Sequence, residues 1–338
     1  MNIKEVSISG GSHVVILGAG ASIAFSLHDG EAKGMALPSM NNLFNLEGIS
    51  QIISSFPQSL ITSNFEETYS NISEVCPDDY RLSDINSIIY EYFCKMKLPN
   101  KPTLYDQLIM SLTGKDLIAT FNWDPFLFQA SQRNYNHGSN PIIVYLHGNV
   151  AVGYNKKNNM IGPAGLRSPR TNNYYRHSQL LYPIKNKDYT KDWFISQQWK
   201  TLKDFLAGDN ITMVTVFGYS APVTDKAALQ MMKDAWGDIN KRNVEQFEII
   251  DIRDENEVIA SWKEFIHPNH YDYCSSFYDS ILAKCPRRTS EMFFCRYIPA
   301  TEEDSFVEEN PMPERFDSFE DMWNWFQPLI DKEDLYTL

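Results

Sequence analysis

The chain of 338 residues is 43% hydrophobic and 13% aromatic, and its 30 basic and 43 acidic residues give a net charge of −13. This apolar content excludes a disordered protein, and no apolar run approaches the ~20 residues that span a bilayer, which excludes an integral membrane protein. The negative charge argues against direct binding of nucleic acid. The N-terminus lacks the apolar core of a signal peptide, so we expect a cytoplasmic protein. The length predicts roughly two domains, or one large domain with an insertion.

The first predicted element is a short buried strand that ends in a glycine turn. Residues 14–17 are all apolar, as expected for a strand buried on both faces. The turn that follows contains Gly18, Ala19, Gly20, Ala21 and Ser22. Its glycines allow the backbone to approach a ligand, and the amides that open the next helix favour a diphosphate. Because Ile23 replaces the third glycine of the dehydrogenase fingerprint, a simple tight connection in an α/β sheet is the alternative.

Helices and buried strands alternate through the middle of the chain. Apolar residues at helical spacing predict helices over residues 82–92 and 104–112. Residues 117–121 and 142–146 predict the second and third buried strands. The polar residues that directly follow these strands are Asn122, Asp124 and His147.

Residues 150–191 differ in charge from the rest of the chain. They contain eight Lys or Arg residues against Asp188 alone, a net charge of +7, whereas the remainder carries −20. The segment is also rich in Gly, Pro and Asn and poor in apolar residues. This contrast predicts a small basic module that interrupts the sheet.

Two more pairs of strand and helix follow the basic module. An apolar stripe predicts a helix over residues 193–206, residues 211–217 predict the fourth strand, and residues 247–250 predict the fifth. A helix with an apolar face over 229–236 separates the last two strands. The residues of interest at the ends of these strands are Gly218, Ser220 and Asp251. The pattern predicts an α/β fold, a Rossmann-like open parallel sheet with helices on both faces and ligands at its carboxyl edge.

Four motifs at these strand ends resemble, in order and spacing, the NAD-binding motifs of the sirtuins. They are Gly18–Ser22, Thr120–Asp124, Leu146–Gly148 and Gly218–Ser220. More narrowly, residues 12–255 look like the sirtuin-like NAD hydrolases of bacterial anti-phage defence. The resemblance implies that residues 1–255 form an NAD-binding catalytic domain in which 150–191 are an insertion. Residues 256–338 are then an acidic, helical C-terminal extension, which we expect to serve association. Its last helix has an apolar face made of Phe319, Met322, Trp323, Phe326 and Ile330, and the alternative is that this helix merely packs on its own domain.

The resemblance also implies roles for individual residues. The turn from Gly18 to Ser22 would hold the diphosphate of NAD. Asn122 would order a water near the nicotinamide ribose, and Asp124 would bind the nicotinamide carboxamide. His147 would act as a general base on a ribose hydroxyl, a task that suits an imidazole.

The remaining site residues belong to the adenosine half of NAD. Gly218 and Ser220 match the second glycine-containing turn of the family, and Asp251 would accept hydrogen bonds from the adenine ribose. Structural alternatives stay open, because Asn122 and Asp124 at a strand end are also typical helix caps.

Two departures from the deacylating sirtuins stand out. Residues 149–200 contain no cysteine, so the paired Cys-x-x-Cys motifs of a zinc module are missing. The Asp-Phe-Arg element of those enzymes is missing as well, with residues 37–40 near its place. We therefore expect no zinc, and lysine deacylation is in doubt.

The sequence thus favours an NAD glycohydrolase that releases nicotinamide and ADP-ribose, and the resemblance implies an NAD-depleting effector of abortive infection. An NAD-dependent deacylase or ADP-ribosyltransferase is one alternative, and a non-enzymatic module that senses NAD or ADP-ribose is another. Because an active NAD hydrolase harms its own cell, we expect control by assembly into a homo-oligomer or by a separate partner chain. A translocase ATPase or an Argonaute-type protein is the kind of partner that the family suggests.

Overall fold

A six-stranded parallel sheet forms the centre of the protein. Its strands are β1 (Ser12–Leu17), β2 (Leu117–Thr120), β3 (Ile142–Tyr145), β7 (Ile211–Phe217), β8 (Gln246–Ile250) and β9 (Tyr271–Cys274). They lie in the order β3-β2-β1-β7-β8-β9, and every neighbouring pair runs parallel. This order confirms the Rossmann-like class, because the chain builds one half of the sheet outward from β1 and the other half outward from β7. The structure, a computed structural model, describes residues 11–30, 40–184, 187–219, 221, 225–242, 245–267, 270–292 and 309–334.

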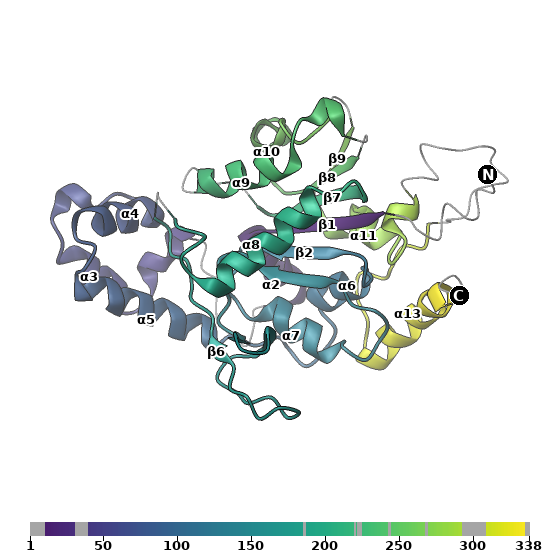
Figure 1. Ribbon diagram of the computed structural model, residues 1–338, viewed down its shortest axis with the longest axis horizontal. Helices are drawn as coiled ribbons and strands as arrows, with labels where there is room; N and C mark the ends of the chain where they lie inside the picture. The colour runs from purple at the N-terminus through teal and green to yellow at the C-terminus, as the bar shows by residue number, and fades with distance from the viewer. Residues whose placement is uncertain are drawn as a thin grey trace.

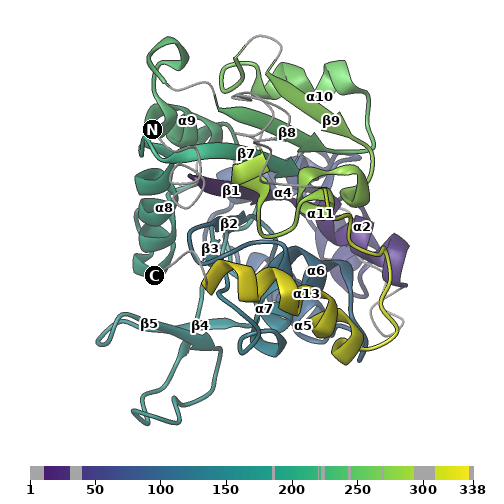
Figure 2. The same ribbon diagram turned by 90° about the vertical axis from the view of Figure 1, so that its right-hand side faces the viewer.

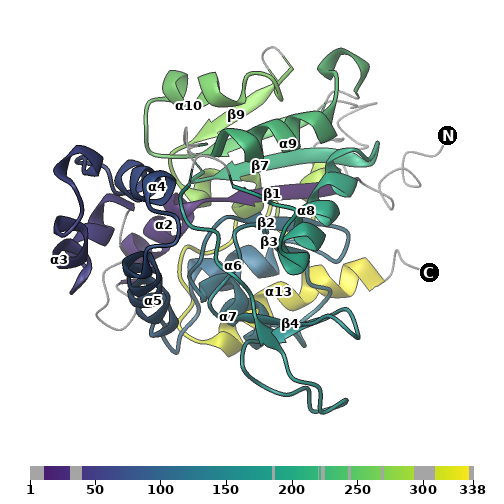
Figure 3. The same ribbon diagram turned by 60° about the vertical axis from the view of Figure 1, so that its left-hand side comes forward.

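Helices cover both faces of the sheet (Figures 1 and 3). The side chains of β1 alternate between two apolar cores, with Val15 and Leu17 in the first and Val14 and Ile16 in the second. The first core includes residues of α2 (Ala19–Asp29), α6 (Leu104–Met110), α7 (Phe126–Arg133) and α13 (Phe319–Asp334). The second includes residues of α8 (Trp193–Leu206), α9 (Lys226–Trp236) and α10 (Glu255–Trp262). A strand covered on both faces requires the unbroken apolar run from which β1 was predicted.

Between α2 and α6 the chain forms a helical lobe over residues 40–94. The lobe comprises η2 (Met40–Asn45), α3 (Ile49–Ser54), η3 (Gln58–Leu60), α4 (Phe65–Val75) and α5 (Tyr80–Cys94). Figures 1 and 3 show α3, α4 and α5 grouped together at one end of the molecule. Ile53, Phe65 and Ile85 continue the first core into the lobe, which therefore packs on the sheet domain through apolar contacts. No helix in the described ranges is both long and apolar enough to cross a membrane.

The basic module contains a small antiparallel sheet that the sequence pattern does not predict. Its strands are β4 (Val152–Asn155), β5 (Met160–Pro163) and β6 (Arg176–His177), in the order β5-β4-β6. Figure 2 shows β4 and β5 projecting away from the main sheet. Only a few of its strand residues are buried, so these strands lack the apolar alternation from which strands are recognised in a sequence.

The segment after residue 255 adds to the same sheet and core. β9 pairs with the outer side of β8, and it was missed because its residues are at most partly buried. The same segment contains η6 (Phe277–Asp279) and α11 (Ile281–Lys284), whereas η5 (Ile239–Lys241) lies between α9 and β8. The division of the chain at residue 255 stays a prediction.

The last helix, α13, packs on its own domain. Met322 and Phe326 are fully buried, and the indole of Trp323 donates to Asn134 Oδ1 at 2.8 Å, just beyond the end of α7. Figure 2 shows α13 running past α6 and α7. The predicted apolar face therefore exists and covers this domain, while a role of the extension in association stays a prediction.

A buried carboxyl group links the sheet to the segment that follows it. Glu248 on β8 accepts hydrogen bonds from the Ile281 amide at 2.8 Å and from Thr215 Oγ1 at 2.9 Å. Burial raises the pKa of Glu248 from 4.5 to about 7, although both hydrogen bonds oppose this rise. Between about pH 4.5 and 7, Glu248 therefore keeps its proton in the folded protein but has lost it in the unfolded chain.

We expect Glu248→Gln to flatten the dependence of stability on pH. Because the pKa of Glu248 is higher in the folded state, stability is lost as the pH rises from about 4.5 through 7, by about 2 kcal/mol between pH 5 and pH 8. The amide variant has no such proton to release. Urea unfolding of both proteins at these two pH values measures the difference, and equal losses would show that Glu248 does not titrate in this range.

Candidate functional site

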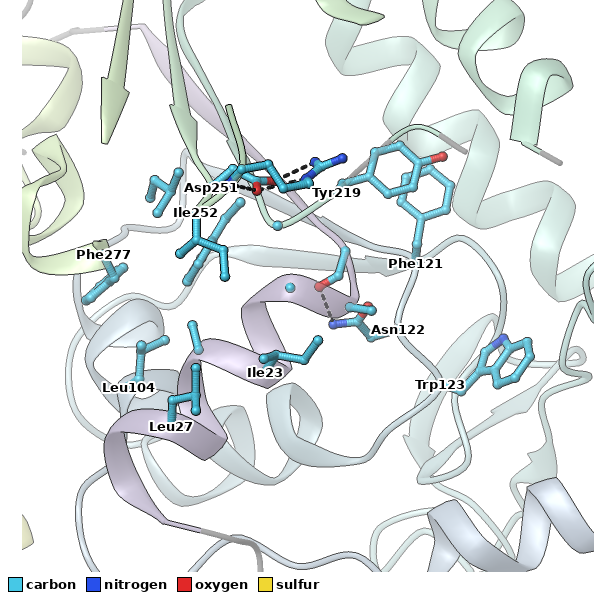
Figure 4. Close-up of a pocket in the computed structure, with 18 of the residues that line it drawn as sticks. Ile23, Leu27, Leu104, Phe121, Asn122, Trp123, Tyr219, Asp251, Ile252 and Phe277 are labelled. Carbon is cyan, nitrogen blue, oxygen red and sulfur yellow. Dashed lines mark hydrogen bonds and ion pairs between the residues drawn. The ribbon is translucent and has the colours of Figure 1, made fainter. Parts of the chain in front are cut away.

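A cavity of about 760 Å³ lies at the carboxyl edge of the sheet, where the turns after β1 and β7 meet (Figure 4). The strand order reverses at this point, which is where open parallel sheets bind ligands, and the volume suits a small molecule or cofactor. The predicted site residues that line the cavity are Gly18, Ala19, Gly20, Asn122, His147, Gly218 and Asp251. Ala21, Ser22 and Asp124 are not among the lining residues, and Ser220 lies outside the described residues.

The glycines of the two turns pack directly against each other. The amide of Gly20 donates to the Gly218 carbonyl at 2.9 Å, and the amide of Gly18 donates to the Phe217 carbonyl at 3.0 Å. A Cβ atom on Gly20 would lie 2.6 Å from Gly218 Cα, and one on Gly218 would lie 2.4 Å from the Ala21 nitrogen. The glycines are therefore required for contact between the turns, and this contact forms part of the cavity wall.

A buried hydrogen-bond network holds Asn122 at the cavity wall. Its Nδ2 donates to the Gly18 carbonyl at 2.9 Å and to Ser22 Oγ at 3.1 Å. The hydroxyl of Ser22 donates its one hydrogen to Asp124 Oδ2 at 2.6 Å. In the contact between Ser22 Oγ and the Tyr105 hydroxyl, also 2.6 Å long, Tyr105 is therefore the donor. With the amide nitrogen engaged, Oδ1 is the atom of Asn122 that a ligand or a water would bind.

Asp124 lies behind this network. Its side chain is buried, and its Oδ1 accepts a hydrogen bond at 3.2 Å from the amide of Phe126, the first residue of α7. Burial raises the pKa of Asp124 to about 6, against the effect of the hydrogen bond from Ser22. These contacts tie Asp124 to the start of α7 and to the network that holds Asn122, and contact between Asp124 and a nicotinamide carboxamide stays a prediction.

His147 is buried two residues beyond the end of β3. Its ring meets Phe121 edge-on with centroids 4.9 Å apart, and its Nε2 lies 3.3 Å from the Tyr189 hydroxyl and 3.8 Å from Asp225 Oδ1. Burial and then the Lys187 ammonium lower the pKa of His147 to about 3, and Asp225 opposes this change. The imidazole is therefore neutral near pH 7, the form that accepts a proton.

An ion pair that the sequence does not predict lies beside His147. Lys187 and Asp225 both line the cavity, and their paired side chains are only 4% and 6% exposed. The Tyr219 hydroxyl donates to the other oxygen of Asp225 at 3.2 Å. Burial alone would raise the pKa of Asp225, but His147 and Lys187 bring it below its ordinary value. The two residues are 38 positions apart in segments without a motif, so no local signal identifies them.

The other end of the cavity combines a carboxylate with an apolar rim. Figure 4 places Asp251 and Ile252 across the cavity from Trp123. The Arg253 guanidinium donates two hydrogen bonds to the Asp251 carboxylate, from Nε at 3.0 Å and from Nη2 at 2.6 Å. A ligand hydroxyl would therefore share this carboxylate with the guanidinium. Leu27 and Ile252 are 77% and 78% exposed, although both are large apolar residues. An exposed apolar rim of this kind suits a flat, weakly polar ring.

Comparisons with known proteins find similarity to Sir2 homologues among solved structures, the family that the four motifs resemble. No family model and no curated protein matches the sequence. A Sir2 homologue–NAD complex is 12% identical, with a TM-score of 0.35 over 87% of this chain and 91% of that chain. A mutant Sir2 homologue in complex with 2′-O-acetyl ADP ribose is 13% identical, with a TM-score of 0.39 over 87% and 93%. Values this low do not establish a shared activity, and the Rossmann-like class rests on the strand order of the protein itself.

Metal ligands are not grouped in the described part of the chain. No three His, Cys, Asp or Glu side chains there are placed to hold a metal ion. The small sheet over residues 152–177 occupies the segment in which a zinc module would be expected. The absence of zinc stays a prediction.

We expect Gly20→Ala to destabilise the protein by about 2 kcal/mol. Alanine favours a helix over glycine by about 1 kcal/mol, but the added methyl group would meet backbone atoms of the second turn at 2.6 Å and push the turns apart. Gly114→Ala is the matched control, because its nearest neighbour would lie at an ordinary 3.5 Å. Guanidinium unfolding of both variants measures the difference, and an equally stable Gly20→Ala protein would contradict the tight contact.

We also expect protein purified without added metal to contain no stoichiometric zinc. A structural zinc site draws on four Cys or His ligands, usually with Cys-x-x-Cys pairs among them, and the sequence contains no such cysteine pair. Elemental analysis measures the content. One zinc per chain would contradict this expectation and favour the deacylase alternative.

Proposed function

We propose that the protein is an NAD glycohydrolase, which cleaves NAD to nicotinamide and ADP-ribose. The observation that carries this proposal is that Asn122 and His147 line one cavity together with the glycine turns after β1 and β7. A cavity that only binds a nucleotide has no need of a buried neutral imidazole beside an oriented amide.

The two ends of the cavity suit the two ends of NAD. Asp251 offers acceptors for ribose hydroxyls, and Leu27 and Ile252 offer apolar surface for adenine. The beginning of α2, with Gly18 and Ala19, suits the diphosphate between the two nucleosides. The nicotinamide ribose would then lie near Asn122 and His147.

The chemistry of the reaction assigns a task to each of these groups. When the bond between ribose and nicotinamide breaks, its electron pair leaves with the nicotinamide nitrogen and the ribose develops oxocarbenium character. Asn122 Oδ1 would orient the water that adds to this carbon. His147 would take the proton of a ribose hydroxyl, and that oxygen would in turn take a proton from the adding water, so that the hydroxyl is restored and one proton leaves through His147. The overall change consumes one water and yields nicotinamide, ADP-ribose and a proton.

A transferase is the second candidate. Asn64 and Glu66 at the start of α4, together with Leu181 and Pro183, line the same cavity. These residues supply a surface on which a second substrate, such as a protein side chain, would approach the ribose in place of water. Deacylation or ADP-ribosylation of a protein would follow, whereas a module that only senses NAD would leave it unchanged.

We further infer, from the resemblance of the motifs, that this activity depletes NAD during abortive infection of a bacterial cell, in the cytoplasm. Control would then come from homo-oligomer formation or from a separate partner chain. The basic module and the acidic extension carry opposite charge, which favours contact between copies. Light scattering with and without residues 317–338 tests this inference, although α13 also contributes to its own core.

We expect Asn122→Ala and His147→Ala each to lower the rate of NAD cleavage by roughly 10²-fold to 10⁴-fold, because each removes a positioned catalytic group. Liquid chromatography of nicotinamide and ADP-ribose measures the rate, and circular dichroism checks the fold. Asn158→Ala and His177→Ala are matched controls, since both side chains are exposed and neither lines the cavity.

The products distinguish the candidate functions. Free ADP-ribose supports the hydrolase, whereas label transferred from NAD to protein supports the transferase and unchanged NAD supports the sensor. A folded Asn122→Ala or His147→Ala protein that cleaves NAD at the parental rate would remove the basis of the catalytic assignment.

A further inference from the structure

Four polar side chains from two segments of the chain gather around His147. Asp225 Oδ1 lies 3.8 Å from His147 Nε2 and is paired with Lys187, and the Tyr219 hydroxyl donates to Asp225 Oδ2 at 3.2 Å. The Tyr189 hydroxyl lies 3.3 Å from the same imidazole nitrogen. His147, Lys187 and Asp225 have side chains that are 7%, 4% and 6% exposed.

Stability alone is a weak reason for a buried ion pair at this place. Removing two charges from water costs several kcal/mol, so a buried pair often contributes no more than an apolar pair of the same size. Lys187 and Asp225 also line the cavity and meet the one imidazole to which we assign proton transfer. Their position indicates a task in the reaction.

We propose that Asp225 is a positioning residue that orients His147 and stabilises the positive charge of its imidazolium, and that Lys187 holds Asp225 in place. This inference rests on the NAD hydrolase function proposed above. It assigns a task to two residues that none of the sequence motifs contains.

The contacts of His147 indicate which ring nitrogen carries the proton. Both polar neighbours, the Tyr189 hydroxyl and Asp225, face Nε2. A carboxylate there favours the tautomer with hydrogen on Nε2 and leaves the lone pair on Nδ1, which is then the nitrogen that accepts a proton. This arrangement follows the general rule that a buried acid fixes the tautomer of a catalytic histidine.

The charges around His147 act in opposite directions. Burial and Lys187 lower its pKa, and Asp225 raises it. The phenols of Tyr189 and Tyr219 stay neutral because burial raises their pKa values above the ordinary range. Glu66, a further carboxylate that lines the cavity, also raises the pKa of Tyr219 and is not among the charges that shift the pKa of His147. Asp225 is therefore the charge best placed to stabilise the imidazolium.

The arrangement also connects the basic module with the reaction. Lys187 lies near the end of that module, after the small sheet, and Asp225 immediately precedes α9. A shift of the segment that carries Lys187 would change the charge next to His147. The module then contributes to the active site directly, independently of any role in association.

The test compares Asp225→Asn and Lys187→Met with matched controls. Asp234→Asn removes a charge from the exposed side of α9, the helix that Asp225 precedes. Lys191→Met removes an exposed charge from the basic module, which also contains Lys187. Steady-state NAD cleavage over pH 3 to 9, a range that includes the lowered pKa of His147, gives kcat and KM. Nitrogen-15 spectra of histidine-labelled protein, assigned with His147→Gln, report the tautomer and the titration of His147 without any turnover.

We expect Asp225→Asn to lower kcat by about 10²-fold with little change in KM, and to abolish the preference for hydrogen on Nε2. Lys187→Met should raise the pKa of His147, because a cation that lowers it is removed. The base works in its neutral form, so activity would then be lost at a higher pH on the acidic side of the profile. The two controls should match the parent in every measurement.

Each result decides the proposal. If Asp225→Asn cleaves NAD at the parental rate, or if its His147 spectrum equals that of the parent, Asp225 is not a positioning residue. If the parent itself does not cleave NAD, the proposed function fails, and the spectra still decide whether Asp225 sets the tautomer. If Asp225→Asn does not fold because Lys187 is left unpaired, the double variant with Lys187→Met removes both charges and supplies the same comparison.

Discussion

The close contact between the glycine turns that follow β1 and β7 is the constraint on which the rest of the site depends. Backbone atoms of one turn touch backbone atoms of the other, so neither Gly20 nor Gly218 has room for a side chain. This contact sets where α2 begins and closes the cavity at the point where the strand order reverses. Asn122 is tied to the same place, because its amide donates to the Gly18 carbonyl. The wall of the cavity and the amide that points from it therefore form one unit.

Two ion pairs line the cavity. Lys187 is held by Asp225, and Arg253 is held by Asp251. A ligand with a negative diphosphate and free hydroxyl groups would exchange some of these contacts for its own, so binding depends on the difference between the two sets of interactions. Groups fixed in this way need little reorganisation when charge develops in the reaction. Burial and the nearby Lys187 ammonium lower the pKa of His147, so its imidazole is neutral and not a buried cation.

The basic module and the C-terminal extension contribute to the domain in different ways. The basic module contributes Leu181, Pro183 and Lys187 to the cavity, while β4 and β5 project from the domain. The C-terminal helix completes the first apolar core through Met322 and Phe326. Charge contrast alone would have grouped both segments as surfaces for partners, but their side-chain contacts place part of each in this domain.

The sequence by itself determined the class of the fold and the edge at which the site lies. Apolar runs that end in glycine or in polar residues identify five of the six strands, and parallel strands bring their carboxyl ends to one edge, which is why Asn122, His147 and Gly218 could be predicted to lie together. Only the tertiary structure decided which side chains face the cavity, because beyond the end of β2 no regular alternation tells whether Asn122 or Asp124 points inward. It also decided the partners of His147, since Lys187 and Asp225 come from segments without periodicity or motif. The strand β9 and the small sheet escaped prediction because strands at an edge or near solvent need few apolar residues. An amphipathic pattern likewise determined that α13 has an apolar face, but only packing decided that this face covers its own domain.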